Sequence, residues 1–305
     1  MYLKHFQLEE LPFRLTPQIS ARFNEPSQAE ALQTLLIALD QGEGFIKVSA
    51  EVGLGKTFLC RLLLEALQPP FITAWIPDPH LSPSALRRAV AEDFGLSLPS
   101  RATRHDLHQA LQKHLTQLVA AGRRPVLLID EAQALPGSAL ETVRLLTNLE
   151  TEQRKLLQVV LFGQPELDHR LASNDFRQLR QRITFSARLS PMTPDTVATY
   201  VKHRLQCAGG DPELFTQAAI KRLARASQGV PRLVNVLAHK SLMSAYGRGK
   251  PKAGWRDVGR AINDTEATAS GWNWSQAMPA MRLTVFGLVA LATFLVVDAW
   301  WGGGP

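Results

Sequence analysis

Cysteine is scarce in this sequence of 305 residues, since only Cys60 and Cys207 occur. The two lie far apart and without the spacing of metal ligands, so we expect neither a disulfide framework nor a zinc site. We predict that both are core or inert thiols in a reducing compartment. The N-terminus also lacks the basic-then-apolar pattern of a secretory signal, which predicts that the globular part stays in the cytoplasm. No internal repeat is visible.

Acidic residues are outnumbered: 27 Asp and Glu stand against 34 Lys and Arg, which gives a net charge of +7. This balance indicates an acidic partner such as nucleic acid or anionic lipid, although ordinary soluble proteins also carry such a charge for solubility. The hydrophobic share of 45% is ample for a folded core and excludes a disordered chain.

Long uncharged apolar runs are rare in soluble domains, yet residues 283–297 form one next to the C-terminus. With Trp300 and Trp301 at the far interface, residues 282–301 are just long enough for a single transmembrane helix. A buried C-terminal helix is the alternative, but the run has no amphipathic period. Arg282 and the basic part before it would remain inside, which predicts a single-pass protein.

A Gly-rich segment near residue 50 joins a short apolar strand to a helix, which is the pattern of a phosphate-binding P-loop. Backbone N–H groups and the helix N-terminus form an anion cradle, into which Lys56 reaches as a point charge. The hydroxyl of Thr57 is a ligand for Mg²⁺. The cofactors expected are therefore ATP and Mg²⁺, and the residues expected to hold the nucleotide are Ala50, Glu51, Val52, Gly53, Leu54, Gly55, Lys56, Thr57 and Phe58.

Ala50 departs from the Walker A consensus, which has glycine at this position. A methyl group is the smallest such change, but it restricts how far the backbone can enter positive φ. We predict that ATP binding tolerates it.

Strand and helix patterns alternate along the chain, which predicts a parallel sheet with helices on both faces, followed by an all-helical part. We divide the sequence into an N-terminal lead-in with a helix from Ser27 to about residue 40 (1–44), a nucleotide-binding core (45–192), a helical lid (193–268), a linker (269–281) and the predicted span (282–301). Ser27 and Glu30 form a capping-box pattern for the first helix. The expected strands are 45–49, 71–76, 126–129, 157–162 and 183–187; the expected helices are 56–67, 82–94, 105–121, 138–149, 195–207, 212–227 and 232–246, with a last helix within 247–281.

A second apolar strand, 126–129, ends in Asp130 and Glu131, which is a Walker B pattern. Asp130 at the strand end is placed to hold the Mg²⁺ shell together with Thr57. Glu131 is placed to polarise an attacking water as general base. A core strand that ends in a solvated turn is the simpler alternative.

Three further polar residues follow in chain order. Gln164 comes at the end of the next strand, where it would orient water or contact the γ-phosphate, or would simply be a turn residue. Arg182, with Arg180 as the alternative, precedes the last strand, where an arginine would reach a neighbouring subunit's site in an oligomer, unless these arginines only form a solvated basic face. Arg232 begins a lid helix and would swing over the γ-phosphate.

The order of these motifs resembles the AAA+ ATPases. The segments Met1–Phe6, Glu51–Gly53, Ile129–Gln133 and Phe162–Leu167 resemble more closely the ExeA/MshM group, which contains the general secretion pathway protein A and the MSHA pilus biogenesis ATPase. The resemblance covers residues 1 to about 246. It implies an AAA+ P-loop NTPase fold and gives the sensor 1 role to Gln164 and the sensor 2 role to Arg232.

The same resemblance implies a membrane-associated or soluble ATPase that works as a homo-oligomer. With the Mg²⁺ ligands and the transmembrane helix expected above, we predict a Mg²⁺-dependent ATPase on the cytoplasmic side of the bacterial inner membrane. Its partners would be proteins of an envelope secretion or pilus assembly machine. A DNA-binding regulatory ATPase of the transposition type is the alternative, and the apolar run at 283–297 argues against nucleic acid as the partner. A nucleotide-bound scaffold that scarcely turns over is a third hypothesis.

Overall fold

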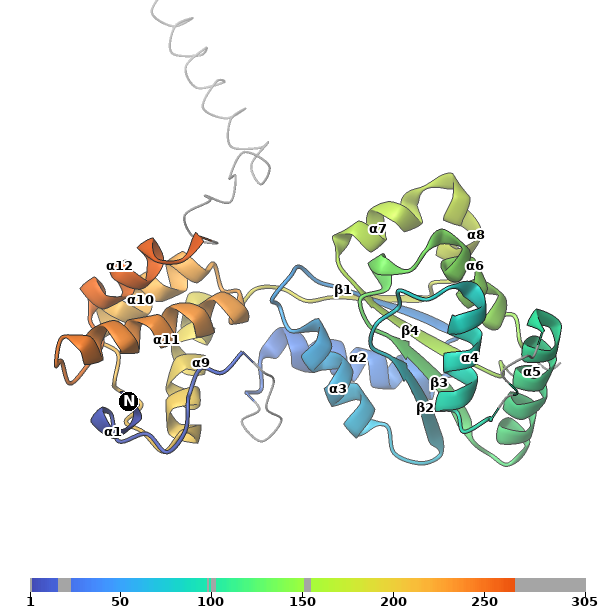
Figure 1. Cartoon of the computed structure of the whole chain (residues 1–305), viewed down its shortest axis with the longest axis horizontal. Helices are drawn as coiled ribbons and strands as arrows, with labels where there is room; N and C mark the ends of the chain where they lie inside the picture. Colours follow the sequence, from blue (N-terminus) through green and yellow to red (C-terminus); the bar gives the residue numbers. More distant parts are fainter. Residues whose placement is uncertain (1, 16–22, 98, 100–102, 151–154, 267–305) are drawn as a thin grey trace, which may run out of the picture.

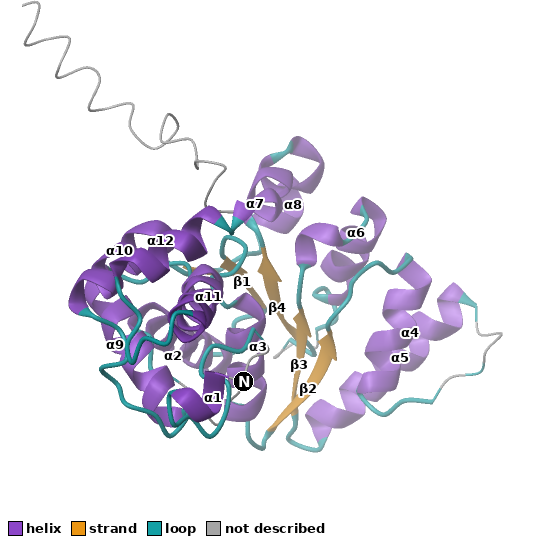
Figure 2. Ribbon diagram, turned by 60° about the vertical axis from the view of Figure 1, so that its left-hand side comes forward, coloured by secondary structure: helices purple, strands orange, loops and turns teal. Residues whose placement is uncertain are grey.

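The structure, a computed structural model, describes residues 2–15, 23–97, 99, 103–150 and 155–266. Figures 1 and 2 show two lobes, one built around a sheet and one entirely helical. The strands are β1 (Phe45–Ser49), β2 (Phe71–Ile76), β3 (Arg124–Ile129), β4 (Gln158–Gly163) and β5 (Phe185–Arg188). The helices are α1 (Tyr2–His5), α2 (Pro26–Asp40), α3 (Lys56–Ala66), α4 (Pro83–Asp93), α5 (Arg104–Ala120), η1 (Ala132–Ala134), α6 (Gly137–Leu146), α7 (Pro165–Ala172), η2 (Asn174–Phe176), α8 (Arg177–Arg180), α9 (Pro194–Cys207), α10 (Gln217–Ser227), α11 (Pro231–Gly247) and α12 (Trp255–Asn263).

All strand pairs are parallel, and their order in the sheet is β2-β3-β4-β1-β5. Successive side chains of a strand point to opposite faces, so each central strand contributes to two cores. Ile46 and Val48 of β1 pack with helices α2 and α3, whereas Phe45 packs with α4, α5 and α6. The predicted parallel sheet covered on both faces is therefore confirmed. It brings the carboxyl ends of β1, β3 and β4 to one edge.

Helices α9 to α12, which we call the lid, form a separate apolar core. The N-terminal residues Tyr2, Phe6, Leu8 and Phe13 are buried in this same core, far along the chain from the lid helices. The backbone of Glu9 donates to the carbonyl of Ala208 (2.9 Å). The expected lead-in is thus split in space: its first residues pack with the lid, and α2 packs on the sheet (Figure 1).

The N-terminal cap of α2 is Glu25, and the prediction of Ser27 was wrong. The Glu25 carboxylate accepts from the backbone N–H of Gln28 (2.7 Å), and Pro26 occupies the first helical position. The hydroxyl of Ser27 instead accepts from the backbone N–H of Ser190 (2.9 Å). A helix that begins at proline leaves the residue before it as the cap, which is why Glu25 takes this place.

The two cysteines differ in exposure. Cys60 lies on the buried face of α3, and burial raises the pKa of its thiol. Cys207 is exposed at the end of α9, with its sulfur 3.4 Å from Nε2 of His203, so it is not a core thiol.

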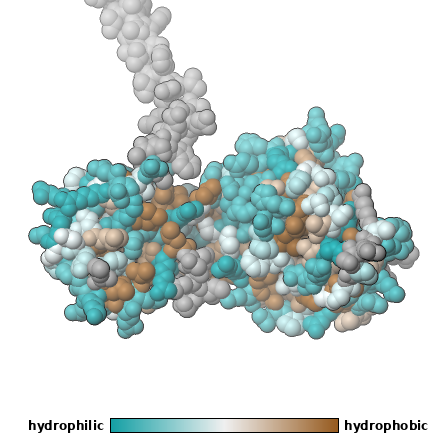
Figure 3. All heavy atoms as spheres, viewed as in Figure 1, coloured by the Kyte–Doolittle hydropathy of each residue, from teal (hydrophilic) through white to brown (hydrophobic). Residues whose placement is uncertain are grey.

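The predicted span, 282–301, and the linker before it lie outside the described residues. Among the helices that the structure does describe, none has the length and apolarity needed to cross a bilayer. The space-filling view shows a predominantly hydrophilic surface along the upper left of the lid (Figure 3).

Candidate functional site

The P-loop connects the end of β1 to the start of α3. Two of its glycines have positive φ, 84° at Gly53 and 94° at Gly55, where other residues would be strained. A Cβ on Gly53 would also lie 3.0 Å from Cβ of Arg232, so the loop and the lid approach each other closely here. These two glycines are therefore required by the shape of the turn.

Ala50 contributes backbone groups to the site. Its N–H donates to the carbonyl of Gly163 at the end of β4 (3.1 Å), and its carbonyl accepts from Nζ of Lys56 (3.0 Å). Its φ is not positive, and its methyl group is buried at 1% exposure in the core under α3. The conformation of this residue therefore does not need glycine.

Lys56 is 5% exposed at the first position of α3. Burial lowers the pKa of its ammonium group, and the negative charges of Glu131 and Asp130 act in the opposite direction. The ammonium group of Lys56 donates to the carbonyl of Ala50, a neutral acceptor, so its charge remains available to an anion such as a phosphate.

Asp130 and Glu131 follow β3 at the same edge of the sheet. Asp130 is 2% exposed and accepts hydrogen bonds from the Thr57 hydroxyl and from the N–H of Glu131 (2.9 Å). Burial raises the pKa of this carboxyl above its ordinary value. Together, Thr57 and Asp130 offer adjacent oxygen ligands of the kind that Mg²⁺ prefers.

Glu131 is held in the left-handed region, with φ 49° and ψ 37°. Its Oε2 accepts from Nε2 of Gln164 (2.9 Å) and from Nε2 of Gln133. Burial acts to raise the pKa of Glu131, but these two donors and the charge of Lys56 outweigh it and hold the pKa below the usual range. The carboxylate is thus kept ionised and aimed, as a general base must be.

Gln133 was not among the residues selected from the sequence. Besides its bond to Glu131, its Oε1 accepts from the N–H of Gln164 (3.0 Å), and its backbone carbonyl accepts from Arg170 on α7 (2.5 Å). Gln133 therefore connects the ends of β3 and β4 to α7. The signal for Gln133 in the sequence was its position two residues after Glu131 of the Walker B pattern.

A cavity of about 420 Å³ lies between the sheet lobe and the lid. Six of the predicted nucleotide-binding residues line it: Val52, Gly53, Gly55, Lys56, Thr57 and Phe58. Glu131, Gln164 and Arg232 line it as well, and the backbone N–H of Arg232 donates to the carbonyl of Gly53 (3.3 Å). Ala50, Leu54 and Asp130 lie buried behind it, whereas Glu51 does not line it.

The opposite wall of the cavity comes from segments that sequence analysis did not select. The lining residues there include Arg14, Leu15 and Phe23 of the N-terminal segment and Tyr200, Arg204 and Asn235 of the lid. The hydroxyl of Tyr200 donates to Asn235 (2.9 Å), and Nε of Arg204 donates to the carbonyl of Pro12 (2.6 Å). This wall depends on contacts between residues more than 180 positions apart, which no local pattern reveals.

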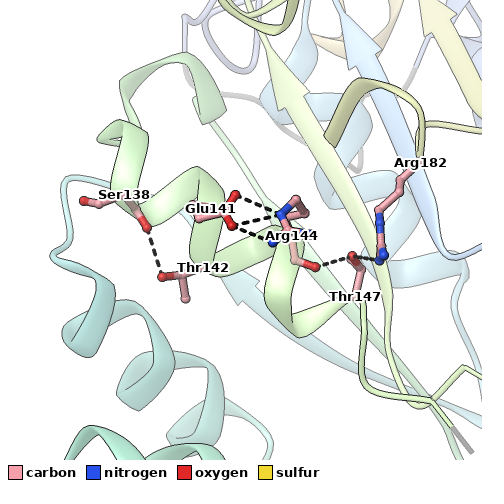
Figure 4. Close-up of polar contacts among 6 residues, drawn as sticks. All are labelled: Ser138, Glu141, Thr142, Arg144, Thr147 and Arg182. Atoms are coloured by element: carbon pink, nitrogen blue, oxygen red, sulfur yellow. Dashed lines mark hydrogen bonds and ion pairs between the residues drawn. The ribbon is translucent and has the colours of Figure 1, made fainter. Parts of the chain in front are cut away.

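Arg182 lies apart from the cavity, between α8 and β5. Its Nη1 donates to Oγ1 of Thr147 (3.2 Å), just past the end of α6, and the Thr147 hydroxyl donates to the carbonyl of Arg144 (2.7 Å; Figure 4). Arg144 is in turn paired with Glu141 (2.6 Å). Arg180 is exposed and donates to the carbonyl of Ala172 (3.3 Å). Neither Arg180 nor Arg182 lines the cavity of its own subunit.

Comparison with known proteins gives three kinds of similarity. A family model described as an AAA domain matches residues 39–171. The general secretion pathway protein A of Aeromonas hydrophila is 39% identical over 303 residues, which is 99% of this chain and 54% of that protein. The chain therefore spans about half the length of this curated relative.

Solved structures with low sequence identity share the fold. Cdc6p from Pyrobaculum aerophilum has a TM-score of 0.65 at 19% identity, covering 83% of this chain and 70% of that one. The Drosophila ORC bound to DNA also has a TM-score of 0.65, at 20% identity, covering 87% and 66% of the two chains. The RuvB branch migration motor of Thermotoga maritima has a TM-score of 0.53 at 16% identity, covering 80% and 73%.

Proposed function

Because the chain belongs to the AAA+ proteins that resemble general secretion pathway protein A, we propose that it hydrolyses ATP in the cavity between the sheet lobe and the lid. The observation that carries the proposal is the convergence of Lys56, Glu131 and Gln164 on one cavity that Arg232 of the lid also lines. Phosphate-binding, water-activating and lid residues thus surround the same space.

The residues fit ATP with Mg²⁺. The backbone N–H groups of the P-loop and Lys56 would bind the phosphates, and Thr57 and Asp130 would hold the cation. Mg²⁺, when bound, neutralises charge that develops on the phosphate oxygens.

Glu131 accepts the proton of the attacking water, while Gln164 fixes the carboxylate and faces the γ-phosphate. Arg232 would contact the γ-phosphate from the lid, since it lines the cavity and the bond of its backbone N–H to Gly53 keeps it beside the P-loop.

Turnover separates this proposal from a nucleotide-bound scaffold. We expect Glu131→Gln to lower kcat by about 10² to 10⁴ while ATP still binds, since the change removes the base and keeps the shape. Titration with a fluorescent ATP analogue measures the binding, and phosphate release measures kcat. If wild type and variant released phosphate equally slowly, the scaffold hypothesis would replace ours.

We further propose that the active form is a homo-oligomer in which Arg182, or alternatively Arg180, completes the neighbouring site. The exposure of Arg180 suits contact with a second subunit directly, whereas Arg182 must first release Thr147.

We propose that ATP hydrolysis supports assembly of a bacterial envelope machine, either a type II secretion system or an MSHA-type pilus. The name of the relative supports the first of these. The chain would be held at the cytoplasmic side of the inner membrane by residues 282–301. Fractionation of cells tests the location, with alkaline extraction to distinguish an integral protein from a peripheral one. A pilus or secretion operon around the gene would identify the machine.

A DNA-dependent regulatory ATPase of the transposition type is the second candidate. The net charge of +7 favours it, and one structural neighbour, the Drosophila ORC, is bound to DNA. Filter binding to duplex DNA across a salt series distinguishes the two, because phosphate contacts make DNA affinity fall steeply with salt. Absence of such binding supports the envelope function.

A further inference from the structure

Two neighbouring lid helices, α10 and α12, present charge of one sign to solvent. Their exposed and half-buried charged side chains are Lys221, Arg222, Arg225, Arg256 and Arg260. Lys221 and Arg225 are one helical turn apart on α10, as are Arg256 and Arg260 on α12, so each pair shares a face. The two helices pack against each other, and Arg222 of α10 contacts Trp255 of α12, so the basic residues lie on adjoining helices.

Two acidic residues of this region are paired with cations. Asp257 of α12 is 2% exposed and pairs with Arg248 (3.1 Å). Asp264, just past α12, pairs with Lys240 of α11 (2.9 Å). These two carboxylates therefore reduce the positive potential of the surface little.

An aromatic ring lies at the centre of this surface. The guanidinium of Arg222 stacks 3.7 Å from the centroid of the Trp255 ring, and its Nη1 donates to the Trp255 carbonyl (3.1 Å). A Cβ on Gly259 would lie 2.7 Å from the same Nη1, so α12 leaves room for the stacked pair. The ring is nevertheless 55% exposed. Tryptophan with flanking arginine is favoured where an apolar phase meets water.

The surface is also close in sequence to the apolar run. The described residues end at Glu266, three residues after the end of α12, and residues 267–282 separate Glu266 from Leu283. Even fully extended, this connection reaches no more than about 60 Å. A chain anchored through residues 282–301 therefore keeps Glu266, and the end of α12 beside it, within about that distance of the membrane.

We propose that Lys221, Arg222, Arg225, Trp255, Arg256 and Arg260, which we call the basic face, dock the lid on the anionic phospholipid headgroups of the membrane. The inference rests on the proposed membrane attachment. The negative potential of an anionic leaflet attracts each nearby Lys or Arg, with about a fivefold gain in binding for each charge. Figure 3 shows the lid edge that carries α10 and α12 as predominantly hydrophilic.

Hydrogen exchange of the full chain in lipid nanodiscs tests this docking. One set of discs contains phosphatidylcholine alone, and the other contains phosphatidylcholine mixed with phosphatidylglycerol. We expect amides of α10 and α12 to exchange several-fold more slowly in the anionic discs, and high salt to remove the difference. The triple variant K221E/R225E/R256E should insert normally and lose this protection.

A matched control carries the same change of charge on the sheet lobe, K113E/R123E/K155E, at exposed positions away from the lid. It should keep the protection of α10 and α12. ATPase activity in detergent checks the folding of both triple variants, because none of the six residues lines the ATP cavity.

The possible results separate the two proposals. A chain that does not enter the discs overturns the membrane attachment, whereas a chain that enters but shows equal exchange in both lipids overturns the docking alone. Binding of a labelled DNA duplex that is lost in K221E/R225E/R256E, without any lipid effect, would assign the basic face to nucleic acid and overturn the lipid proposal.

Discussion

The side-chain amide of Gln164 donates to the carboxylate of Glu131 across 2.9 Å, and so joins the ends of the neighbouring strands β4 and β3. Glu131 is held from a second side by Gln133, which also bonds the backbone of Gln164. The carboxylate that we propose as the general base is therefore fixed by two amides.

Removing the second amide should change the pH dependence of hydrolysis. We expect Gln133→Met to raise the pKa of Glu131, because an ionised carboxylate loses one of its donors. The base must be ionised to act, so the acidic limb of kcat/KM should move to higher pH. We expect kcat at neutral pH to fall roughly tenfold, from looser positioning of the base.

A pH profile of ATP turnover measures this, and thermal unfolding serves as the folding control. An acidic limb that stays at the wild-type pH would mean that Gln133 does not influence the ionisation of Glu131.

We expect Asp130→Asn to stabilise the nucleotide-free protein and to weaken Mg²⁺-dependent ATP binding. Burial raises the pKa of Asp130, so its ionised form is destabilised in the folded protein at neutral pH. Asparagine keeps the Oδ1 that accepts from the N–H of Glu131 but carries no charge. We expect the melting temperature without nucleotide to rise by about 2–4 °C, corresponding to about 1 kcal/mol.

The sign of this effect should depend on pH. With its pKa raised on folding, Asp130 costs stability above that folded pKa, and the cost disappears as the group protonates at lower pH. The advantage of asparagine should therefore shrink in acid, while Mg²⁺-dependent ATP binding should weaken at neutral pH. Calorimetry from neutral to acidic pH, with and without nucleotide, checks both statements.

Ala50→Gly should have little effect on ATP affinity. Ala50 does not adopt positive φ and acts through its backbone N–H and carbonyl, which glycine also has. The added freedom of the unfolded chain and the lost methyl group should reduce stability by about 1 kcal/mol. Isothermal titration with ATP and denaturant unfolding give the two values. A large gain in affinity would show that the methyl group does strain the loop.

Mixing experiments should identify the arginine that acts between subunits. An Arg182→Ala subunit keeps its own base, and a Glu131→Gln subunit keeps its own Arg182. We expect Arg182→Ala alone to be about 10³-fold or more below wild type, and Glu131→Gln alone to be about 10² to 10⁴ below it. A mixture should regain part of the activity, because an intact site can then face an intact arginine.

Arg180→Ala is the matched test for the alternative. Its side chain is exposed and makes only a 3.3 Å bond to the Ala172 carbonyl, so its removal should leave the fold intact. If the Arg180 variant is the one that loses and regains activity on mixing, Arg180 is the residue that acts between subunits. Thr147→Val, which frees Arg182 from its present partner, should not reduce activity if Arg182 has to leave Thr147 to act.

Much of the sheet lobe was predictable because its signals are local. Strands β1 and β2 have the residues expected from their apolar runs, Phe45–Ser49 and Phe71–Ile76. The parallel arrangement then follows from alternation with helices, and it brings the polar ends of β3 and β4 together. This is why Glu131 and Gln164, 33 positions apart, were selected separately and yet are in contact.

The parts that could not be predicted depend on contacts that sequence spacing does not encode. The packing of Tyr2 and Phe6 in the lid joins residues that are more than 180 positions apart, and their short segment has no distinctive period. The helix cap at Glu25 was predictable in principle, since Pro26 at the first helical position designates the residue before it. The contact of Gln133 with Glu131 could not be predicted, because it depends on the left-handed backbone conformation of Glu131.

The split of the N-terminal segment gives the lid two covalent attachments to the sheet lobe. The chain passes from the lid to the sheet lobe between Phe23, which packs on the lid core, and Pro26 at the start of α2, and it returns from β5 to α9 between Leu189 and Thr193. Because the lid is connected to the sheet lobe at two points, it can rotate most easily about the axis that joins these two connections. ATP binding and release should therefore drive the lid through rotation about one axis, and each cycle would produce a stroke of fixed direction.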